Sequence, residues 1–260
     1  MASAPQQTNL PLFYKKLVPV TSGTHGTWSA RQTDKATWLV YQHAIPLTVE
    51  EFPMASRHFP IVFSAGEGAN SVPLALMGMN EGVNVFVADD GSISEEIYMP
   101  GYARRYPFIL ARLNPDSEEL SLCFDEGTTL VGEFEDGKRL FENGEPTEAC
   151  METLRFCENF EIAGNKTAQF IQELVKHDLL INGELSVQPE GTGDPIIYRG
   201  FRMVSEEKLK QLRGDVLRGW AQNGILPLIY AHLMSMQLVR DIFGRQVRQG
   251  KAPKPKNGAG

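Results

Sequence analysis

The first half of the chain alternates short apolar runs with turn residues, a pattern typical of strands rather than helices. Six runs have the length of an ordinary strand: residues 17–20, 38–41, 60–64, 83–88, 108–113 and 120–124. Between some of them lie Asp89-Asp90-Gly91 and Asn114-Pro115-Asp116, whose residues adopt turn geometry at little cost. We therefore expect mainly antiparallel strands, including a hairpin that pairs residues 83–88 with residues 97–99.

After Pro146 the apolar positions recur with the period of a helix. They place Met151, Leu154, Cys157 and Phe160 on one face, which Phe170, Leu174 and Val175 continue. Gly164 and Asn165 interrupt this face. The pattern predicts two consecutive helices, or one helix broken near Gly164-Asn165, with Thr167 as the cap of the second helix.

Capping residues predict the shorter helices. Thr48 precedes Glu50 and Glu51 at the start of a helix over residues 49–57, because a threonine cap and acidic first turn stabilise a helix N-terminus. Ser205 begins another helix that ends near residues 213–214, after a strand over residues 196–204. The last helix follows Gly224. Its apolar stretch, residues 224–239, is shorter than the roughly 20 residues that cross a bilayer, so we expect a buried core helix.

These elements predict an α+β fold. We expect one domain over residues 10–244, with a β-rich part (10–145) of mainly antiparallel strands and a mainly helical part (146–244) packed on it. Residues 1–9 and 245–260 are expected to be disordered tails, because residues 245–260 contain basic residues and no acidic ones.

The overall charge narrows the range of partners. The 260 residues include 25 basic and 32 acidic side chains, for a net charge of -7, so nucleic acid and anionic membranes would be repelled. Residues 1–10 contain no basic segment followed by an apolar one, which predicts a cytoplasmic protein rather than an exported one. Cys123, Cys150 and Cys157 lack metal-binding spacing and are expected to be buried free thiols.

Patterns for catalysis, metals and cofactors are incomplete. Ser205 and Lys208 have the spacing of a serine nucleophile and its lysine base, but the other motifs of those enzymes are missing, so Ser205 is interpreted as a helix cap. The five histidines lack zinc-ligand spacing, and His232 lies on an apolar helix, where we expect a hydrogen-bonded core residue. The acid pair Asp125-Glu126 is expected to be solvated. We predict no catalytic residue, no metal site and no cofactor.

The aromatic-arginine segment, residues 98–108, is the strongest candidate for a binding surface. Three tyrosines, two arginines and two prolines occur in eleven residues, and we predict ligand or partner binding by five of them: Tyr98, Tyr102, Arg104, Arg105 and Tyr106. Proline restricts the backbone, while tyrosine and arginine provide amphipathic area and forked donors suited to a protein partner or a small anionic or sugar-like ligand. The alternative is that the tyrosines pack into the core and the arginines pair with Glu95, Glu96 or Asp125.

Five stretches of the sequence together form a family-specific pattern. They are Phe59-Pro60-Ile61-Val62-Phe63, residues 98–108, Leu122-Cys123-Phe124-Asp125-Glu126, Leu140-Phe141 before Asn143-Gly144-Glu145-Pro146, and Ile229-Tyr230-Ala231-His232-Leu233. In these stretches the sequence resembles the bacterial SapC family. They extend from about residue 11 to residue 243 in the order of the family. The family name implies a surface layer or peptide transport. Its members resemble cytoplasmic accessories encoded beside TonB-dependent receptors, flavin-dependent halogenases and cupin-like oxygenases, and the family supplies no catalytic residues.

Three functions follow as hypotheses. The leading one is a non-enzymatic binding or adaptor protein linked to outer-membrane nutrient uptake, since no complete catalytic set is present. The second is an enzyme for a small acidic or sugar-like substrate, built from Arg104, Arg105, a tyrosine and a distant histidine or carboxylate. A polar pocket joining Arg105 to His58 or His232 would support that enzyme. The third is a surface-layer component. A homodimer is a further expectation from the frequency of dimers among soluble proteins.

Overall fold

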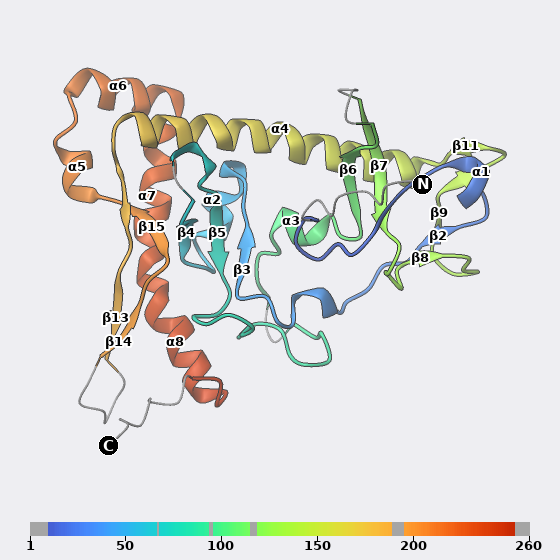
Figure 1. The fold of residues 1–260 in the computed structure, drawn as a ribbon, viewed down its shortest axis with the longest axis horizontal. Helices are drawn as coiled ribbons and strands as arrows, with labels where there is room; N and C mark the ends of the chain where they lie inside the picture. The colour runs from blue at the N-terminus through green and yellow to red at the C-terminus, as the bar shows by residue number, and fades with distance from the viewer. Residues whose placement is uncertain (1–9, 67, 94–95, 115–118, 189–194, 253–260) are drawn as a thin grey trace, which may run out of the picture. The chain divides into compact units, whose positions relative to one another are not determined.

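The computed structural model describes residues 10–66, 68–93, 96–114, 119–188 and 195–252. They belong to two compact units that interleave along the sequence. Unit 1 comprises Met1–Asp34 and Arg104–Glu161, and unit 2 comprises Lys35–Ala103 and Ile162–Gly260. Antiparallel strands occur mainly in the first half of the chain and most helices follow in the second, which confirms the α+β fold (Figure 1). The single domain over residues 10–244 stays a prediction.

Unit 1 contains three small antiparallel sheets, in the orders β1-β7-β6, β8-β2-β9 and β10-β11. The strands are β1 (Leu17–Pro19), β2 (Ser29–Ala30), β6 (Phe108–Arg112), β7 (Leu120–Asp125), β8 (Val131–Gly132), β9 (Lys138–Arg139), β10 (Phe141–Glu142) and β11 (Glu145–Pro146). A short helix, α1 (Ser22–His25), follows β1. The first part of the long helix α4 (Glu148–Lys176), up to Glu161, completes the unit.

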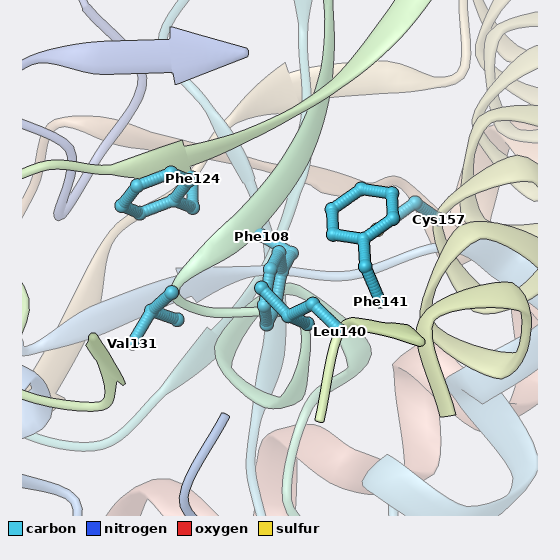
Figure 2. Close-up of a cluster of buried hydrophobic side chains, with 6 residues drawn as sticks. All are labelled: Phe108, Phe124, Val131, Leu140, Phe141 and Cys157. Carbon is cyan, nitrogen blue, oxygen red and sulfur yellow. The ribbon is translucent and has the colours of Figure 1, made fainter. Parts of the chain in front are cut away.

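Apolar side chains from these sheets and from α4 form the core of unit 1. Figure 2 shows one cluster of this core, with six buried residues: Phe108, Phe124, Val131, Leu140, Phe141 and Cys157. Phe108, Phe124 and Val131 come from β6, β7 and β8, Leu140 lies between β9 and β10, and Phe141 begins β10. Cys157 lies on the face of α4 that the helical period predicts. The core therefore fixes β6 and β7 against the start of this helix.

Unit 2 is built on a five-stranded antiparallel sheet in the order β12-β15-β4-β5-β3. Its strands are β3 (Ala44–Pro46), β4 (Ile61–Ser64), β5 (Pro73–Leu76), β12 (Leu180–Asn182) and β15 (Phe201–Val204), and β13 (Leu185–Val187) pairs with β14 (Ile196–Tyr198). The helices are α2 (Phe52–Ala55), α3 (Gly101–Arg104, whose last residue belongs to unit 1), α5 (Glu206–Lys210), α6 (Gly214–Asn223), α7 (Ile225–Ser235) and α8 (Val239–Arg248), with the 3-10 turns η1 (Thr37–Leu39), η2 (Val49–Glu51), η3 (Gly68–Asn70) and η4 (Met236–Leu238).

Helix α7 packs on the middle of this sheet, alongside β4 and β15 (Figure 1). His232 on α7 is fully buried and bonds to both strands, as the predicted core histidine requires. The backbone N–H of Val204 donates to Nε2 at 3.1 Å, so Nδ1 carries the proton that it donates to the carbonyl of Ile61 at 2.7 Å. Burial lowers the pKa of His232 to about 4, so the ring stays neutral at neutral pH.

Two predicted strands have other structures. Residues 38–41 overlap η1, whose local backbone bonds from Leu39 and Val40 form a 3-10 turn, because a short apolar run fits either structure. Residues 83–88 form no ladder, since the Asn84 side chain accepts the backbone N–H groups of Phe86 and Val87. The predicted hairpin with residues 97–99 is therefore wrong, and Val87 instead makes a single bridge to Ile93.

Helix α4 is continuous through Gly164, so the predicted break is wrong. Thr167 does not cap a second helix. Its hydroxyl donates to the carbonyl of Ala163 at 2.7 Å and accepts the backbone N–H of Val49 at 3.0 Å. The buried face continues through Phe170 and other apolar residues of α4, which stabilises the helix beyond the glycine.

The predictions for the other helices are largely confirmed. Ser205 caps α5 by accepting the N–H of Lys208, and α7 follows Gly224, which has a positive φ of 85°. Helix α6 covers a stretch that the sequence left unassigned. Helix α8 continues to Arg248, beyond the predicted start of the tail at residue 245, because buried Gln246 accepts the N–H of Met79 at 3.0 Å.

Residues 1–9 and 253–260 and the predicted turn at 115–116 lie outside the described residues. Among the helices of the described chain, none combines the length and apolar character of a membrane span.

Candidate functional site

The aromatic-arginine segment links the two units. Its residues form the approach to α3, the helix itself, and the turn that leads into β6. The boundary between the units falls within it, after Ala103. The peptide bond between Tyr106 and Pro107 is cis. Each half of the segment is held by side chains of its own unit.

In unit 2 the carboxylate of Glu51 holds the start of the segment. Its Oε1 accepts hydrogen bonds from the Tyr98 hydroxyl at 3.1 Å and the Gly101 backbone N–H at 2.5 Å. Its Oε2 accepts from the backbone N–H and the hydroxyl of Thr48, at 2.8 and 2.9 Å. Glu51 is only 7% exposed, so four donors surround a nearly buried carboxylate. A buried carboxylate needs such donors, because an unsatisfied one would be costly.

In unit 1 the two arginines lie against rings of helix α4, one helical turn apart. The Arg105 guanidinium is 4.4 Å from the centre of the Phe160 ring, and its Nη1 is 3.4 Å from Oε1 of Glu161. Arg105 is 7% exposed. Arg104 is exposed, and its guanidinium is 5.3 Å from the centre of the Phe156 ring. The arginine that the segment presents to solvent is therefore Arg104.

Tyr106 connects the segment to the core of unit 1. Its hydroxyl donates to Oδ2 of Asp125 at 3.0 Å, and its ring packs edge-on against Phe13 and Tyr14. The Oδ1 of Asp125 accepts the backbone N–H groups of Lys15 and Lys16. Asp125 is 1% exposed, so the prediction of a solvated carboxylate is wrong: these three donors replace its water. Burial raises the pKa of Tyr106 to about 12.

The five predicted binding residues therefore differ in how far solvent reaches their side chains. Tyr102 and Arg105 are buried, Tyr98 and Tyr106 are half-buried, and Arg104 is exposed. Arg105 contacts Glu161, which is outside the predicted set of Glu95, Glu96 and Asp125; Glu95 lies outside the described residues. Binding by these five residues stays a prediction.

The partners of the segment were missed by sequence reasoning. Glu51 and Asp125 are about fifty and twenty residues away from their tyrosine partners, and nothing local distinguishes them from solvated acids. Phe156 and Phe160 had a weak signal. Their spacing of four residues on a helix places both rings on neighbouring turns, where they can contact consecutive arginines.

The residues of the enzyme hypothesis are divided between the units. Arg104, Arg105 and Tyr106 belong to unit 1, whereas His58 and His232 belong to unit 2. Both ring nitrogens of His232 are bonded to backbone groups, so this side chain holds the sheet together. Within the described part of the chain, no group of three histidine, cysteine, aspartate or glutamate side chains is placed to hold a metal ion.

The cysteines are free and buried, as predicted. Burial raises the pKa of all three thiols, that of Cys157 to about 12. A thiol with a raised pKa is a poor nucleophile, because the reactive form is the thiolate.

Comparison with known proteins decides the family. The family model for SapC matches residues 20–242, which include the whole aromatic-arginine segment, Glu51, Asp125 and His232. The chain belongs to the SapC family. No curated protein and no solved structure matches it. The SapC match spans most of the residues of both units and confirms the resemblance of the separate stretches, including the segment with Arg104.

Proposed function

We propose that this SapC-family chain is a non-enzymatic binding or adaptor protein, and that the surface around Arg104 recognises an acidic protein partner. The observation that carries the proposal is the exposed guanidinium of Arg104 over the Phe156 ring. Arginine is enriched among the residues that dominate binding energies, since its planar group forms paired hydrogen bonds with carboxylates and stacks on rings.

The anchoring of the neighbouring residues supports this role. Arg105 is held by Phe160 and Glu161, and Tyr106 is held by Asp125. These contacts fix the backbone on the C-terminal side of Arg104. A partner would therefore meet an arginine whose backbone is already ordered, and binding to an ordered group costs less conformational entropy.

The cellular role that we propose is a cytoplasmic accessory of outer-membrane, TonB-dependent nutrient uptake. The support is the SapC family membership. Recognition of a partner through the surface around Arg104 fits an adaptor, because an adaptor has to bind a specific partner and does not have to catalyse a reaction.

A comparison of bait proteins tests the proposal. Wild type, Arg104→Glu and Arg112→Glu would each be used to capture proteins from a native lysate of the source bacterium. Arg112 is a matched control, because it is an exposed arginine of the same unit on β6. Changing Arg105 is avoided, since this buried residue also holds the fold. We expect a partner with wild type and Arg112→Glu that is lost with Arg104→Glu.

Other results would contradict the proposal. Capture of the same proteins by all three baits would remove Arg104 from recognition. Absence of any stoichiometric partner of the wild-type bait would contradict the adaptor role itself.

A further inference from the structure

Unit 2 contains a hollow of about 290 Å³ that the sequence did not predict. It lies where the end of helix α2, the stretch around Phe86 and helix α8 meet, and all of its lining residues belong to unit 2. A volume near 300 Å³ is at the lower end of the range for small-molecule sites. The hollow is therefore large enough for a compact metabolite and small for an extended one.

Charges of both signs line this hollow. The basic groups are Arg57 and Arg245, and the acidic groups are Glu96 and Asp241. His58 also lines it and adds a group that can donate or accept a hydrogen bond. The chain brings these residues together from three separate stretches, which explains why no local motif revealed them.

Three of the charged side chains have no partner in the described part of the chain. Arg57, Glu96 and Asp241 make no side-chain hydrogen bond or ion pair there, although other exposed charges of unit 2 are paired, such as Lys166 with Glu50. All three are exposed. Opposite charges that line one hollow without bonding to each other remain available to a ligand that carries both signs.

The apolar residues that line the hollow are held in place by packing and by hydrogen bonds of the nearby backbone. Phe86 and Ile242 are 2% and 1% exposed, and Leu238 lies beside them in the lining. The Arg245 guanidinium is 5.1 Å from the centre of the Phe86 ring, which orients that arginine. Asn84 holds the backbone of Phe86 and Val87 with its side-chain oxygen, at 2.9 and 3.1 Å.

Helix α8 is tied to the same stretch of chain. The Gln249 side chain donates to the carbonyl of Val85 at 2.8 Å, and Nζ of Lys251 donates to the carbonyl of Asn84 at 2.9 Å. The buried side chain of Gln246 donates to Asn80. These bonds fix two walls of the hollow relative to each other before any ligand enters, and a preformed site loses less entropy on binding.

We propose that this hollow binds a zwitterion of amino-acid size that has an apolar side chain. Its acidic group would meet Arg57, Arg245 and His58, and its ammonium group would meet Glu96 and Asp241. Phe86, Leu238 and Ile242 would contact the apolar side chain. A simple anion would face two carboxylates, and a simple cation would face two guanidiniums. A purely apolar ligand would desolvate all of these charges without compensation.

Calorimetric titration of the purified full chain with each of the twenty standard L-amino acids tests the proposal. We expect saturable binding of at least one amino acid with an apolar side chain. Its analogues that lack the amino group or the carboxyl group should bind at least about tenfold more weakly, since each loses hydrogen bonds to charged groups. Binding of none of the twenty at millimolar concentration overturns the proposal, and so does equal binding of either analogue.

Single substitutions locate the ligand. Arg57→Ala and Asp241→Asn should each weaken binding at least about tenfold without shifting the thermal unfolding midpoint, because both side chains are exposed and bond to no other residue that the structure describes. The control is Arg218→Ala, which removes an exposed arginine of helix α6 outside the hollow and should bind like wild type. Wild-type affinity in both hollow variants would overturn the proposal.

The hollow is independent of the Arg104 surface. Arg104→Glu should bind the amino acid as wild type does, so loss of the protein partner and loss of the small ligand are separate results. A chain that binds an amino acid and captures no protein would support the hollow and contradict the adaptor role.

Discussion

The imidazole of His232 accepts the backbone N–H of Val204 through Nε2 at 3.1 Å, and this bond ties helix α7 to strand β15. The other nitrogen donates to Ile61 on β4. A single neutral side chain therefore satisfies backbone groups of two neighbouring strands at the centre of the sheet. Ser235, one turn later on α7, bonds to the N–H of Ile61 at 2.9 Å and completes the connection.

This arrangement predicts a loss of stability in acid. Burial lowers the pKa of His232 to about 4, whereas an unfolded histidine titrates near 6.5. As the pH falls from 6.5 towards 4, the unfolded chain gains a proton that the folded chain does not. The stability that is present above pH 6.5 is therefore lost, by about 3 kcal/mol for this group, since one pKa unit corresponds to about 1.4 kcal/mol.

Urea unfolding of wild type and His232→Gln between pH 7 and pH 4 measures this loss. The glutamine keeps a donor and an acceptor but does not titrate, so its stability should fall less steeply over this range. Parallel curves for the two proteins would show that His232 is not the group responsible.

The continuity of helix α4 gives a second prediction. Gly164 is inside the helix, and beyond the helix's own backbone a Cβ at this position would meet no atom within 4 Å. Gly164→Ala should therefore stabilise the protein by about 1 kcal/mol, because glycine is the less favourable residue in a helix. Gly224→Ala is the contrasting variant, since its φ of 85° strains an alanine and should destabilise the protein. Destabilisation by Gly164→Ala in thermal unfolding would indicate a break at this position.

At His232 and in the middle of helix α4, the sequence predicted one feature and missed another. The apolar face of α4 and the buried His232 followed from periodicity, because burial of one helix face leaves a repeating pattern. The missing break at Gly164 did not follow from the sequence. Packing of Phe170 and a hydroxyl bridge from Thr167 to Val49, 118 positions earlier, outweigh the local preference of glycine.

Only part of the candidate site could be predicted from the sequence, because its contacts join residues far apart along the chain. The density of tyrosine and arginine in the aromatic-arginine segment was visible in the sequence. The carboxylates that bind these tyrosines were not, since Glu51 looked like any acid in a first helical turn and Asp125 like any acid at a strand end. The hollow beside α8 combines three separate stretches, and nothing short of the fold brings these together.

Neighbouring glutamates provide a third prediction. Glu51 accepts four hydrogen bonds while nearly buried, whereas Glu50 forms an exposed ion pair with Lys166. Glu51→Ala should cost about 3 kcal/mol of the free energy of unfolding, because it leaves the Gly101 N–H and the Tyr98 hydroxyl without their acceptor. Glu50→Ala should cost below about 1 kcal/mol. Chemical denaturation compares them, and equal losses would refute this role for Glu51.

Tyrosine ionisation supplies a fourth prediction. The pKa of Tyr106 is raised to about 12 because partial burial disfavours the charged phenolate, so the folded chain keeps its proton above pH 10 while the unfolded chain loses it. Stability from this group is present below pH 10 and falls as the pH rises towards 12. Ultraviolet titration of the folded protein should lose one late-ionising tyrosine in Tyr106→Phe. Removal of an early-ionising tyrosine instead would contradict the burial. Tyr41→Phe, at a 71% exposed position, is the control.

The exposed Arg104 on its Phe156 ring is the group that we propose to recognise an acidic protein partner. The most direct test of this proposal is the dissociation constant of the partner captured by the wild-type chain, measured for wild type, Arg104→Glu and Arg112→Glu at the same salt concentration. We expect at least about thirtyfold weaker binding for Arg104→Glu, which corresponds to the roughly 2 kcal/mol lost at a dominant arginine, and wild-type binding for Arg112→Glu. Equal dissociation constants for the two variants would contradict the proposal.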